Sequence, residues 1–218
     1  MQCAAFALCC ANGDKPDLVR RVADAKGDLM IEKPPAAVSD DLPAIIRQVE
    51  EAGITCVQSF PQRLIPSNRT VKQILDAGEL GPIGMVRKRH GHGFALARLA
   101  LDMPWIVDPE RAGGGALLDE GVHEMDLLRH YFGEPESVVA EVGGVHTDLP
   151  VEDTGVMLFR FPGGVIVELA SGWAWRAGGP STEIYGSEGT LLQFFTDSAS
   201  NAAPDPSGPS VHDGPLLT

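Results

Sequence analysis

Short apolar runs alternate with amphipathic helical patterns over residues 4–59, and this alternation constrains the fold more than any other feature. The runs are 4–10, 29–31 and 54–59, and the segments between them place apolar residues every three to four positions. Ala4–Cys10 has no polar alternation, which is typical of a strand covered on both faces. Parallel strands need long crossover connections, usually helices. The pattern therefore predicts βαβαβ, part of a doubly wound parallel sheet.

The two predicted helices carry start and stop signals. Pro16 opens the first helix, at a position where the first turn tolerates proline. Ser39 or Asp40 is the expected N-cap of the second helix, and Gly53 is its expected end.

The pattern changes further along the chain. Residues 85–92 predict a strand with a basic, polar face, and residues 113–132 predict a long helix. Beyond Gly133, strands are expected at 137–145, 154–161, 164–171, 182–185 and 190–195. Phe161–Gly164 reads as a hairpin turn, so this second sheet is expected to be antiparallel.

The expected fold class is α/β followed by α+β. A partial doubly wound parallel sheet precedes an antiparallel open-faced sheet with helices on one side. The expected domain boundaries are 1–62 and 63–196, followed by a Pro-rich tail at 197–218.

Charge and composition exclude two classes of protein. Seventeen basic and thirty acidic side chains give a net charge of −13, which nucleic acid and anionic membranes repel. No apolar run reaches the roughly 18 residues that span a bilayer. Cys3, Cys9, Cys10 and Cys56 lack the C-x-x-C spacing of a zinc site, so we expect free thiols in a reducing cytoplasm.

The densest polar constellation follows the glycine triplet Gly113–Gly115. On a continuous helix Asp119, His123 and Asp126 share one stripe, and a carboxylate one turn from an imidazole can orient it as a general base. The glycines leave the amides of a helix N-terminus open to a ligand. The alternative is a solvated acidic helix face with an incidental histidine.

Glu32-Lys33-Pro34 ends the second predicted strand, at the edge where open α/β sheets bind ligands. A lysine there can donate a proton or anchor a substrate. The alternative is a strand-end charge beside a loop proline.

Together the two motifs resemble the Gfo/Idh/MocA family of NAD(P)-dependent oxidoreductases. The resemblance runs from about residue 4 to residue 195, and the helix motif Gly-Gly-Gly-x-x-x-Asp-x-Gly-x-His-x-x-Asp is its most specific part. Further stretches that fit are 60–66, 75–84, 103–105, 159–164 and 186–190.

The resemblance implies hydride transfer between a sugar or polyol carbinol carbon and the nicotinamide of NAD or NADP. By this resemblance His123 takes the hydroxyl proton, Asp119 orients His123, and Lys33 binds the reacting oxygen. It also implies that Glu32, Lys33 and Pro34 lie against the cofactor.

Arg63 and Trp105 are weaker matches to the family, as pocket-lining residues; a surface salt bridge and a core position are the respective alternatives. The resemblance further implies a homo-oligomer formed through the antiparallel sheet. No nucleic acid or membrane partner is expected.

The sequence departs from the family at the pyrophosphate turn. G-x-G-x-x-G, which brings backbone amides against a dinucleotide, does not occur in these 218 residues. We therefore expect a fragment that lacks the first half of the nucleotide domain and the C-terminal end, and that binds NAD(H) poorly.

Two other functions remain open. A metal-dependent sugar isomerase or hydrolase could use His90, His92, Asp119, His123, Asp126 and His130 as ligands. A non-catalytic binding or oligomerisation module could persist through the second sheet alone.

Overall fold

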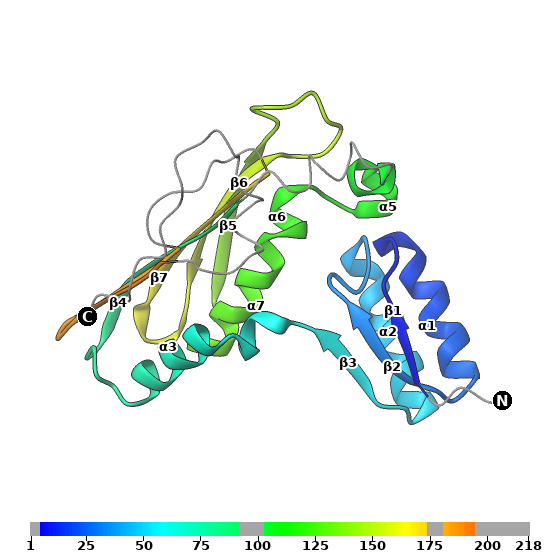
Figure 1. Cartoon of the computed structure of the whole chain (residues 1–218), viewed down its shortest axis with the longest axis horizontal. Helices are drawn as coiled ribbons and strands as arrows, with labels where there is room; N and C mark the ends of the chain where they lie inside the picture. The colour runs from blue at the N-terminus through cyan, green and yellow to red at the C-terminus, as the bar shows by residue number, and fades with distance from the viewer. Residues whose placement is uncertain (1–4, 92–102, 174–180, 195–218) are drawn as a thin grey trace, which may run out of the picture.

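The computed structural model of this chain describes residues 5–91, 103–173 and 181–194. These residues form two sheets, each with helices packed against it (Figure 1). The N-terminal sheet has three strands and the second sheet has six. The predicted order, an α/β part before an α+β part, is confirmed. The predicted tail at 197–218 lies outside the described residues.

The N-terminal sheet is a parallel βαβαβ unit, as the alternating pattern predicts. Its strands lie in the order β1-β2-β3, and both neighbouring pairs are parallel. Val19, Val22 and Ile45 of the two helices are buried with Leu29 and Ile31 of the middle strand. The elements are β1 (Ala5–Leu8), α1 (Lys15–Asp24), β2 (Asp28–Glu32), α2 (Leu42–Ala52) and β3 (Cys56–Ser59).

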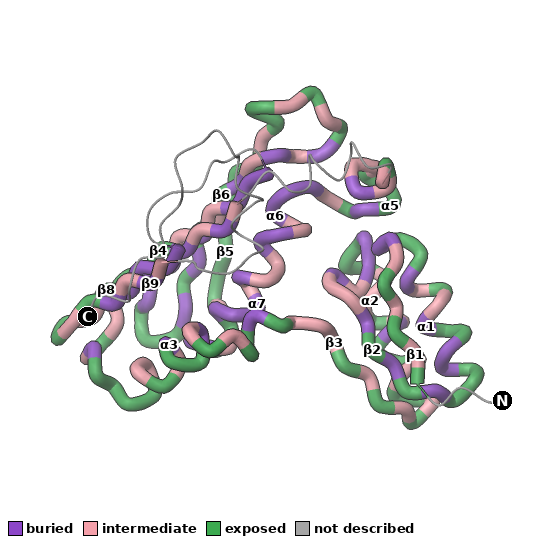
Figure 2. The backbone as a smooth tube through the Cα atoms, viewed as in Figure 1, coloured by how far each residue is buried: buried purple, intermediate pink, exposed green. Residues whose placement is uncertain are grey.

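The described residues cover this sheet on one face only, contrary to the prediction that the first strand is covered on both faces. Exposed and half-buried residues alternate along β1 (Figure 2). Met30 and Val57 are 42% and 55% exposed. The helices α1 and α2 contact each other and therefore cover the same face. An apolar run does not reveal whether one or both of its faces will be covered.

The ends of α2 follow the sequence signals with one shift. Gly53 has φ 65° and ends the helix in the left-handed conformation that glycine adopts without strain. Ser39 and Asp40 lie in a separate 3₁₀ turn, and the N-cap residue is Asp41. The predicted N-cap, Ser39 or Asp40, is therefore wrong: the observed N-cap is one residue after Asp40, because the 3₁₀ turn continues directly into the helix.

The second sheet is mixed rather than purely antiparallel. Its strand order is β5-β6-β7-β4-β8-β9, and β4 pairs in parallel with β7 while every other neighbouring pair is antiparallel. The first strand of this sheet lies between two strands that come much later in the chain, a pairing that local pattern does not encode. The strands are β4 (Ile83–Gly91), β5 (Ser137–Gly143), β6 (Thr154–Arg160), β7 (Ile166–Gly172), β8 (Thr182–Gly186) and β9 (Thr190–Gln193).

The turn between β6 and β7 is confirmed. It is a short 3₁₀ segment, Pro162–Gly164, in which Gly163 and Gly164 have φ 79° and 85°. Two consecutive positive φ angles are strained for residues with a Cβ atom, so this hairpin requires glycine at both positions.

Helices cover one face of the second sheet, as expected. These helices are α3 (Pro66–Asp76), α6 (Ala116–Asp119) and α7 (Gly121–Phe132), and α5 (Pro109–Ala112) precedes α6 (Figure 1). Leu127 and Leu128 of α7 are buried with Val86, Phe159 and Val167 of the sheet. None of the described helices is long and apolar enough to cross a membrane.

The long helix predicted over 113–132 is broken. Gly115 has non-helical dihedrals, α6 ends at Asp119, and Glu120 joins it to α7. A Cβ atom on Gly115 would lie 1.9 Å from the carbonyl oxygen of Glu152. The segment that contains Glu152 therefore packs directly against Gly115, where the chain is not helical. Asp119 and His123 therefore belong to different helices.

Candidate active site

The carboxyl end of β2 carries Glu32-Lys33-Pro34, and a buried lysine holds the backbone of this segment. Lys15 donates from Nζ to the carbonyl oxygens of Glu32 and Pro34 at 2.8 and 2.6 Å, and to Oδ1 of Asn12 at 2.8 Å. Burial lowers the pKa of Lys15 to about 8. Sequence reasoning missed Lys15, because a lysine in an amphipathic helix is normally solvated.

Lys33 reaches across to the end of α6. Its Nζ atom lies 2.5 Å from Oδ1 of Asp119 and 2.6 Å from the carbonyl oxygen of the same residue. The two side chains are 14% and 26% exposed, so the pair lies at a boundary that solvent reaches. The structure thus brings together two candidate residues that are 86 positions apart in the chain.

His123, in the first turn of α7, lies among aromatic rings. Its ring is stacked on that of His90, with centroids 6.4 Å apart and 24° between the planes. Phe60 meets it edge-on at 6.5 Å. Burial, followed by the positive charge of Lys33, lowers the pKa of His123. Within the described part of the chain, the buried Nδ1 atom of His123 has no hydrogen-bond partner.

The structure, which describes both residues, shows no hydrogen bond between Asp119 and His123, the pair expected from their spacing. The described hydrogen bonds and ion pair of the Asp119 carboxylate go to Lys33 instead. The break between α6 and α7 removes the continuous helix on which the two residues would share a stripe. The described neighbours of the His123 ring are the rings of His90 and Phe60.

Arg63 and Asp126 form a separate pair. Arg63 donates from Nε and from one terminal nitrogen to the two carboxylate oxygens of Asp126, at 2.7 and 2.6 Å. The Arg63 side chain is 42% exposed, whereas that of Asp126 is 4% exposed. The geometry is the bidentate ion pair that the sequence left open as the alternative to pocket lining.

Trp105 and the other members of the cofactor motif have local contacts. Trp105 is half-buried against a small apolar cluster that contains Ile106, Val151 and Trp173. This environment matches the core position that the sequence offered as the alternative to pocket lining. Glu32 accepts from the backbone amide of Lys33 at 3.2 Å. The peptide bond between Lys33 and Pro34 is cis.

The amides after the glycine triplet are occupied, contrary to expectation. The carboxylate of Glu152 accepts from the backbone amides of Gly115 and Leu117 at 2.7 and 3.1 Å, and its carbonyl oxygen accepts from Ala116 at 2.9 Å. This chain's own carboxylate therefore takes the place that sequence reasoning assigned to a ligand. No local signal ties Glu152 to the glycines, because they are far apart in sequence.

A buried charged cluster lies next to His123 and was not expected. Lys88 and His90 of β4 meet Glu120 and Glu124 of the α6–α7 segment, and all four residues are buried. Sequence reasoning predicted a basic face for this strand but could not tell which of its two faces would be covered.

The metal ligands considered from sequence do not converge among the described residues. Within 5–91, 103–173 and 181–194, no group of three or more histidine, cysteine, aspartate or glutamate side chains could hold a metal ion. Asp119 and Asp126 are instead paired with Lys33 and Arg63. His92 lies outside the described residues.

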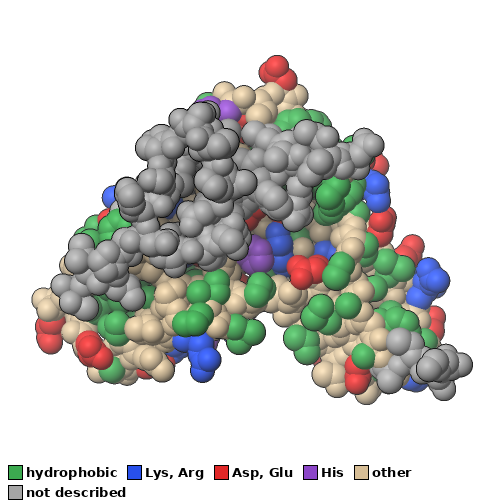
Figure 3. Space-filling view, in the orientation of Figure 1, with side chains coloured by type: hydrophobic (Ala, Val, Ile, Leu, Met, Phe, Trp, Pro, Cys, Tyr) green, Lys and Arg blue, Asp and Glu red, His purple; other side chains and the backbone are tan. Residues whose placement is uncertain are grey.

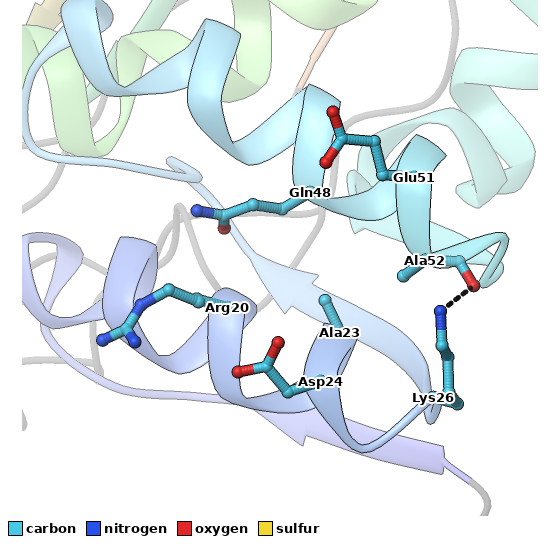
Figure 4. A pocket seen from close by; sticks show the side chains of 7 residues that line it. All are labelled: Arg20, Ala23, Asp24, Lys26, Gln48, Glu51 and Ala52. Atoms are coloured by element: carbon cyan, nitrogen blue, oxygen red, sulfur yellow. Dashed lines mark hydrogen bonds between the residues drawn. The ribbon is translucent and has the colours of Figure 1, made fainter.

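A hollow of ≈ 260 Å³ lies between α1 and α2 (Figure 4). It is at the C-terminal ends of these helices, which lead into the amino ends of β2 and β3. That edge is opposite to the one where Lys33 lies, and parallel α/β sheets bind ligands at the carboxyl edge. The lining residues are Arg20, Ala23, Asp24, Lys26, Gln48, Glu51 and Ala52.

The geometry at the carboxyl edge of β2 suits proton transfer at a hydroxyl group. Lys33 supplies an ammonium group, and His123 supplies an imidazole whose lowered pKa favours the neutral, proton-accepting form. Histidine, basic and acidic side chains gather in the hollow between the two parts of the molecule (Figure 3).

The sequence matches a known family over more than half its length. The profile described as GFO/IDH/MocA C-terminal domain matches residues 68–192. D-xylose 1-dehydrogenase (NADP(+)) 2 of Haloferax volcanii is 29% identical over 197 residues, which cover 88% of this chain and 56% of that protein. Myo-inositol 2-dehydrogenase of Thermotoga maritima is 27% identical over 195 residues, which cover 86% of this chain and 55% of that protein.

Solved structures share the fold. The WlbA dehydrogenase from Bordetella pertussis, in complex with NADH and UDP-GlcNAcA, superposes with a TM-score of 0.79 at 23% identity. The superposition covers 91% of this chain and 61% of that one. The chain spans about half the length of the curated relatives it matches.

Proposed function

Because this chain belongs to the GFO/IDH/MocA family, we propose that it serves NAD(P)-dependent hydride transfer at a CH–OH carbon of a sugar or polyol. The observation that carries the proposal is the contact of Lys33 with Asp119 at the carboxyl end of a parallel strand, beside His123. The relatives named as xylose and inositol dehydrogenases support this substrate class.

The described residues fit the nicotinamide end of such a cofactor. Glu32, Lys33 and Pro34 follow a parallel strand at its ligand-binding edge, and Lys15 holds their backbone. The unpartnered Nδ1 of His123 is the kind of buried polar atom that a bound group or an ordered water satisfies. When bound, the cofactor supplies the hydride acceptor or donor.

The proposed roles follow from these contacts. His123 accepts the hydroxyl proton on its neutral ring. Lys33 donates a hydrogen bond to the same oxygen, and Asp119 holds the lysine ammonium in place. Asp119 thus acts through Lys33, and not through His123 as the sequence predicts.

We expect these 218 residues to bind a whole dinucleotide weakly. They contain no G-x-G-x-x-G turn, whose backbone amides and helix N-terminus bind the pyrophosphate. The affinity for NAD(P) then comes from contacts with the nicotinamide end alone. Assays should therefore use millimolar concentrations of the cofactor.

The test is turnover of D-xylose and of myo-inositol with millimolar NAD⁺ or NADP⁺, followed by the absorbance of the reduced nicotinamide. We expect His123→Asn to lower the rate by about 10²–10⁴-fold, because it removes the general base. The matched control is His146→Asn, which changes an exposed histidine outside the site and should leave the rate unchanged. Equal rates in the two variants would contradict the proposal.

A binding measurement covers the case in which turnover is too slow to detect. Saturation-transfer NMR should show magnetisation passing from the protein to the nicotinamide ring protons of NAD⁺, with a smaller signal in Lys33→Met. The absence of transfer from the unmodified chain at millimolar NAD⁺ would contradict the assignment.

We also propose that two copies of this chain associate through the face of the second sheet that the described helices leave uncovered. Met85 and Ile166 are cross-strand neighbours on that face, and Leu158, which is 48% exposed, pairs there with Glu168, two residues along β7 from Ile166. Leu158→Glu should shift the chain to monomer in size-exclusion chromatography with light scattering, whereas the matched control Leu64→Glu, at a leucine that is 73% exposed, should not. A wild-type monomer would contradict this proposal and with it a non-catalytic oligomerisation role.

The proposed location is the reducing cytoplasm. Among the described residues Cys9, Cys10 and Cys56 are free thiols, which persist where glutathione and thioredoxin keep cysteines reduced. Alkylation of these thiols in intact cells would support the proposal. Protection of all three as disulfides would contradict it.

A further inference from the structure

Four charged side chains form a chain beneath α7, on the covered face of the second sheet. Lys88 donates to Thr182 at 2.8 Å and lies 3.0 Å from Oε2 of Glu124. The other carboxylate oxygen of Glu124 lies 2.5 Å from Nδ1 of His90. Nε2 of His90 lies 3.1 Å from the carboxylate of Glu120. Lys88, His90, Glu120 and Glu124 are 1%, 2%, 8% and 0% exposed.

His90 faces a carboxylate at each ring nitrogen. A neutral imidazole can donate from only one nitrogen, whereas the imidazolium donates from both. Two carboxylates therefore favour the charged ring. These four groups are then two cations and two anions, and their pairing lowers the cost of burying the charges.

The pKa directions agree with this arrangement. Burial by itself would lower the pKa of His90, but its hydrogen bonds to Glu120 and Glu124 outweigh burial and raise the pKa to about 10. Burial likewise opposes ionisation of Glu124, yet the charge of Lys88 and the hydrogen bond from His90 hold the pKa of Glu124 at about 2.

The charged ring of His90 lies against the ring of His123. The two planes are nearly parallel, at 24°, and the centroids are 6.4 Å apart. Among the described residues, the other charges that act on His123 are Lys33, Glu120 and Glu124. Side-chain alternation along β4 places Arg87, which pairs with Glu168, on the opposite face of the sheet. Lys33 and His90 disfavour a proton on His123, whereas Glu120 and Glu124 favour one; burial, the largest cause, together with the two cations leaves the pKa of His123 lowered.

We propose that His90 is a permanently charged positioning residue, locked between Glu120 and Glu124, which holds the ring of His123 in place and keeps it neutral. The consequence for turnover rests on the function proposed above, because a neutral His123 is the form that can accept a proton from a hydroxyl group. The electrostatic role itself does not require any cofactor or substrate.

The experiment is an NMR titration of the full chain labelled with ¹⁵N at histidine, in the absence of cofactor. The ¹⁵N shifts of a charged imidazolium differ from those of a neutral ring. We expect His90 to keep imidazolium shifts at both ring nitrogens through neutral and mildly alkaline pH. We expect His123 to titrate below the ordinary histidine midpoint of about 6.5. His123→Asn assigns the second set of signals by their loss.

The decisive variant is His90→Asn, which removes the charge next to His123. We expect the titration midpoint of His123 to move upward in this variant. The matched control is His146→Asn, which removes an exposed histidine elsewhere and should leave that midpoint unchanged. A midpoint that moves equally in both variants, or in neither, would overturn the proposal.

The wild-type titration keeps the proposal falsifiable if His90→Asn does not fold. A neutral His90 near pH 7, or a His123 that titrates at or above the ordinary midpoint, would overturn the proposal without any variant. The readout is independent of catalysis. A negative result in the titration therefore does not contradict the hydride-transfer proposal. A negative result in the turnover assay does not affect the charged state of His90, which the NMR spectrum tests separately.

Discussion

Two lysine–carboxylate pairs lie close together in this molecule, and their surroundings are opposite. Lys33 and Asp119 meet at the carboxyl edge of the parallel sheet, where their side chains are 14% and 26% exposed. Lys88 and Glu124 meet beneath α7, where both side chains are 0% exposed. Both acids come from the same short stretch of chain, on either side of the break between α6 and α7.

The comparison separates a pair that can serve a ligand from one that serves the fold. A buried ion pair that loses one partner leaves an uncompensated charge in a medium of low polarity. A pair that solvent reaches can rearrange or exchange partners at small cost. Lys33 can therefore exchange partners, as the role proposed for it requires, whereas Lys88 is held by Glu124 and Thr182.

The largest expected effect is on the buried pair. Glu124→Gln should lower the free energy of unfolding by about 3–5 kcal/mol, because it leaves the ammonium of Lys88 and the ring of His90 without their shared anion. Urea denaturation followed by circular dichroism measures this change. A loss comparable to that of a surface substitution would show that the cluster is not a buried charged unit.

The control for this prediction is the pair at the boundary. Lys33→Met should cost at most about 1 kcal/mol, because the carboxylate of Asp119 remains partly solvated after its partner is removed. If Lys33→Met destabilised the chain as much as Glu124→Gln, the two pairs would not differ in the way proposed.

A smaller effect is expected from pH. The pKa of His90 is about 10 in the folded chain and about 6.5 when unfolded, so the folded state binds more protons between these values. Stability contributed by His90 is thus complete below about pH 6.5 and falls as pH rises, by at most about 1.4 kcal/mol per unit. Lys15, whose pKa is lowered to about 8 in the folded chain, acts in the opposite direction: above that pH its contribution makes the folded state more stable as pH rises.

The window that isolates His90 is therefore roughly pH 7 to 8. Urea midpoints measured across it should decrease with pH in the wild-type chain. A urea midpoint that rose with pH through this window would contradict a charged His90. The buried pair would then lack the charged neighbour that distinguishes it from the pair at the boundary.

Local pattern predicted the elements of the fold well. The βαβαβ order, the end of α2 at Gly53 and the glycine turn after β6 all depend on neighbours in sequence. The parallel pairing of β4 with β7 could not be predicted in this way, because two other strands, β5 and β6, and the described helices α5, α6 and α7 lie between them in the chain. The exposure of one face of β1 could not be predicted for a related reason. Whether a strand face is covered depends on which distant elements pack against it, and not on the residues of the strand itself.

The candidate site was predicted in part. The motifs placed Lys33 and Asp119 among the candidates, and the structure brings these two together. The same reasoning paired Asp119 with His123, two described residues between which no hydrogen bond is seen, and left the amides of the glycine triplet open. A segment from beyond residue 150 approaches Gly115 and fills those amides with Glu152, and such a contact leaves no trace in the spacing of residues 113–126.

The amino-acid sequence by itself determined the alternation of strands and helices and the residue types available at the strand end and at the helix start. These are consequences of short-range sterics and of the periodicity of apolar side chains. Tertiary structure alone decided that Lys88 and His90 are buried while Arg87, on the same strand, is not. The physical reason is that the free energy of a charge depends on the carboxylates and the solvent around it, and folding brings those from distant parts of the chain.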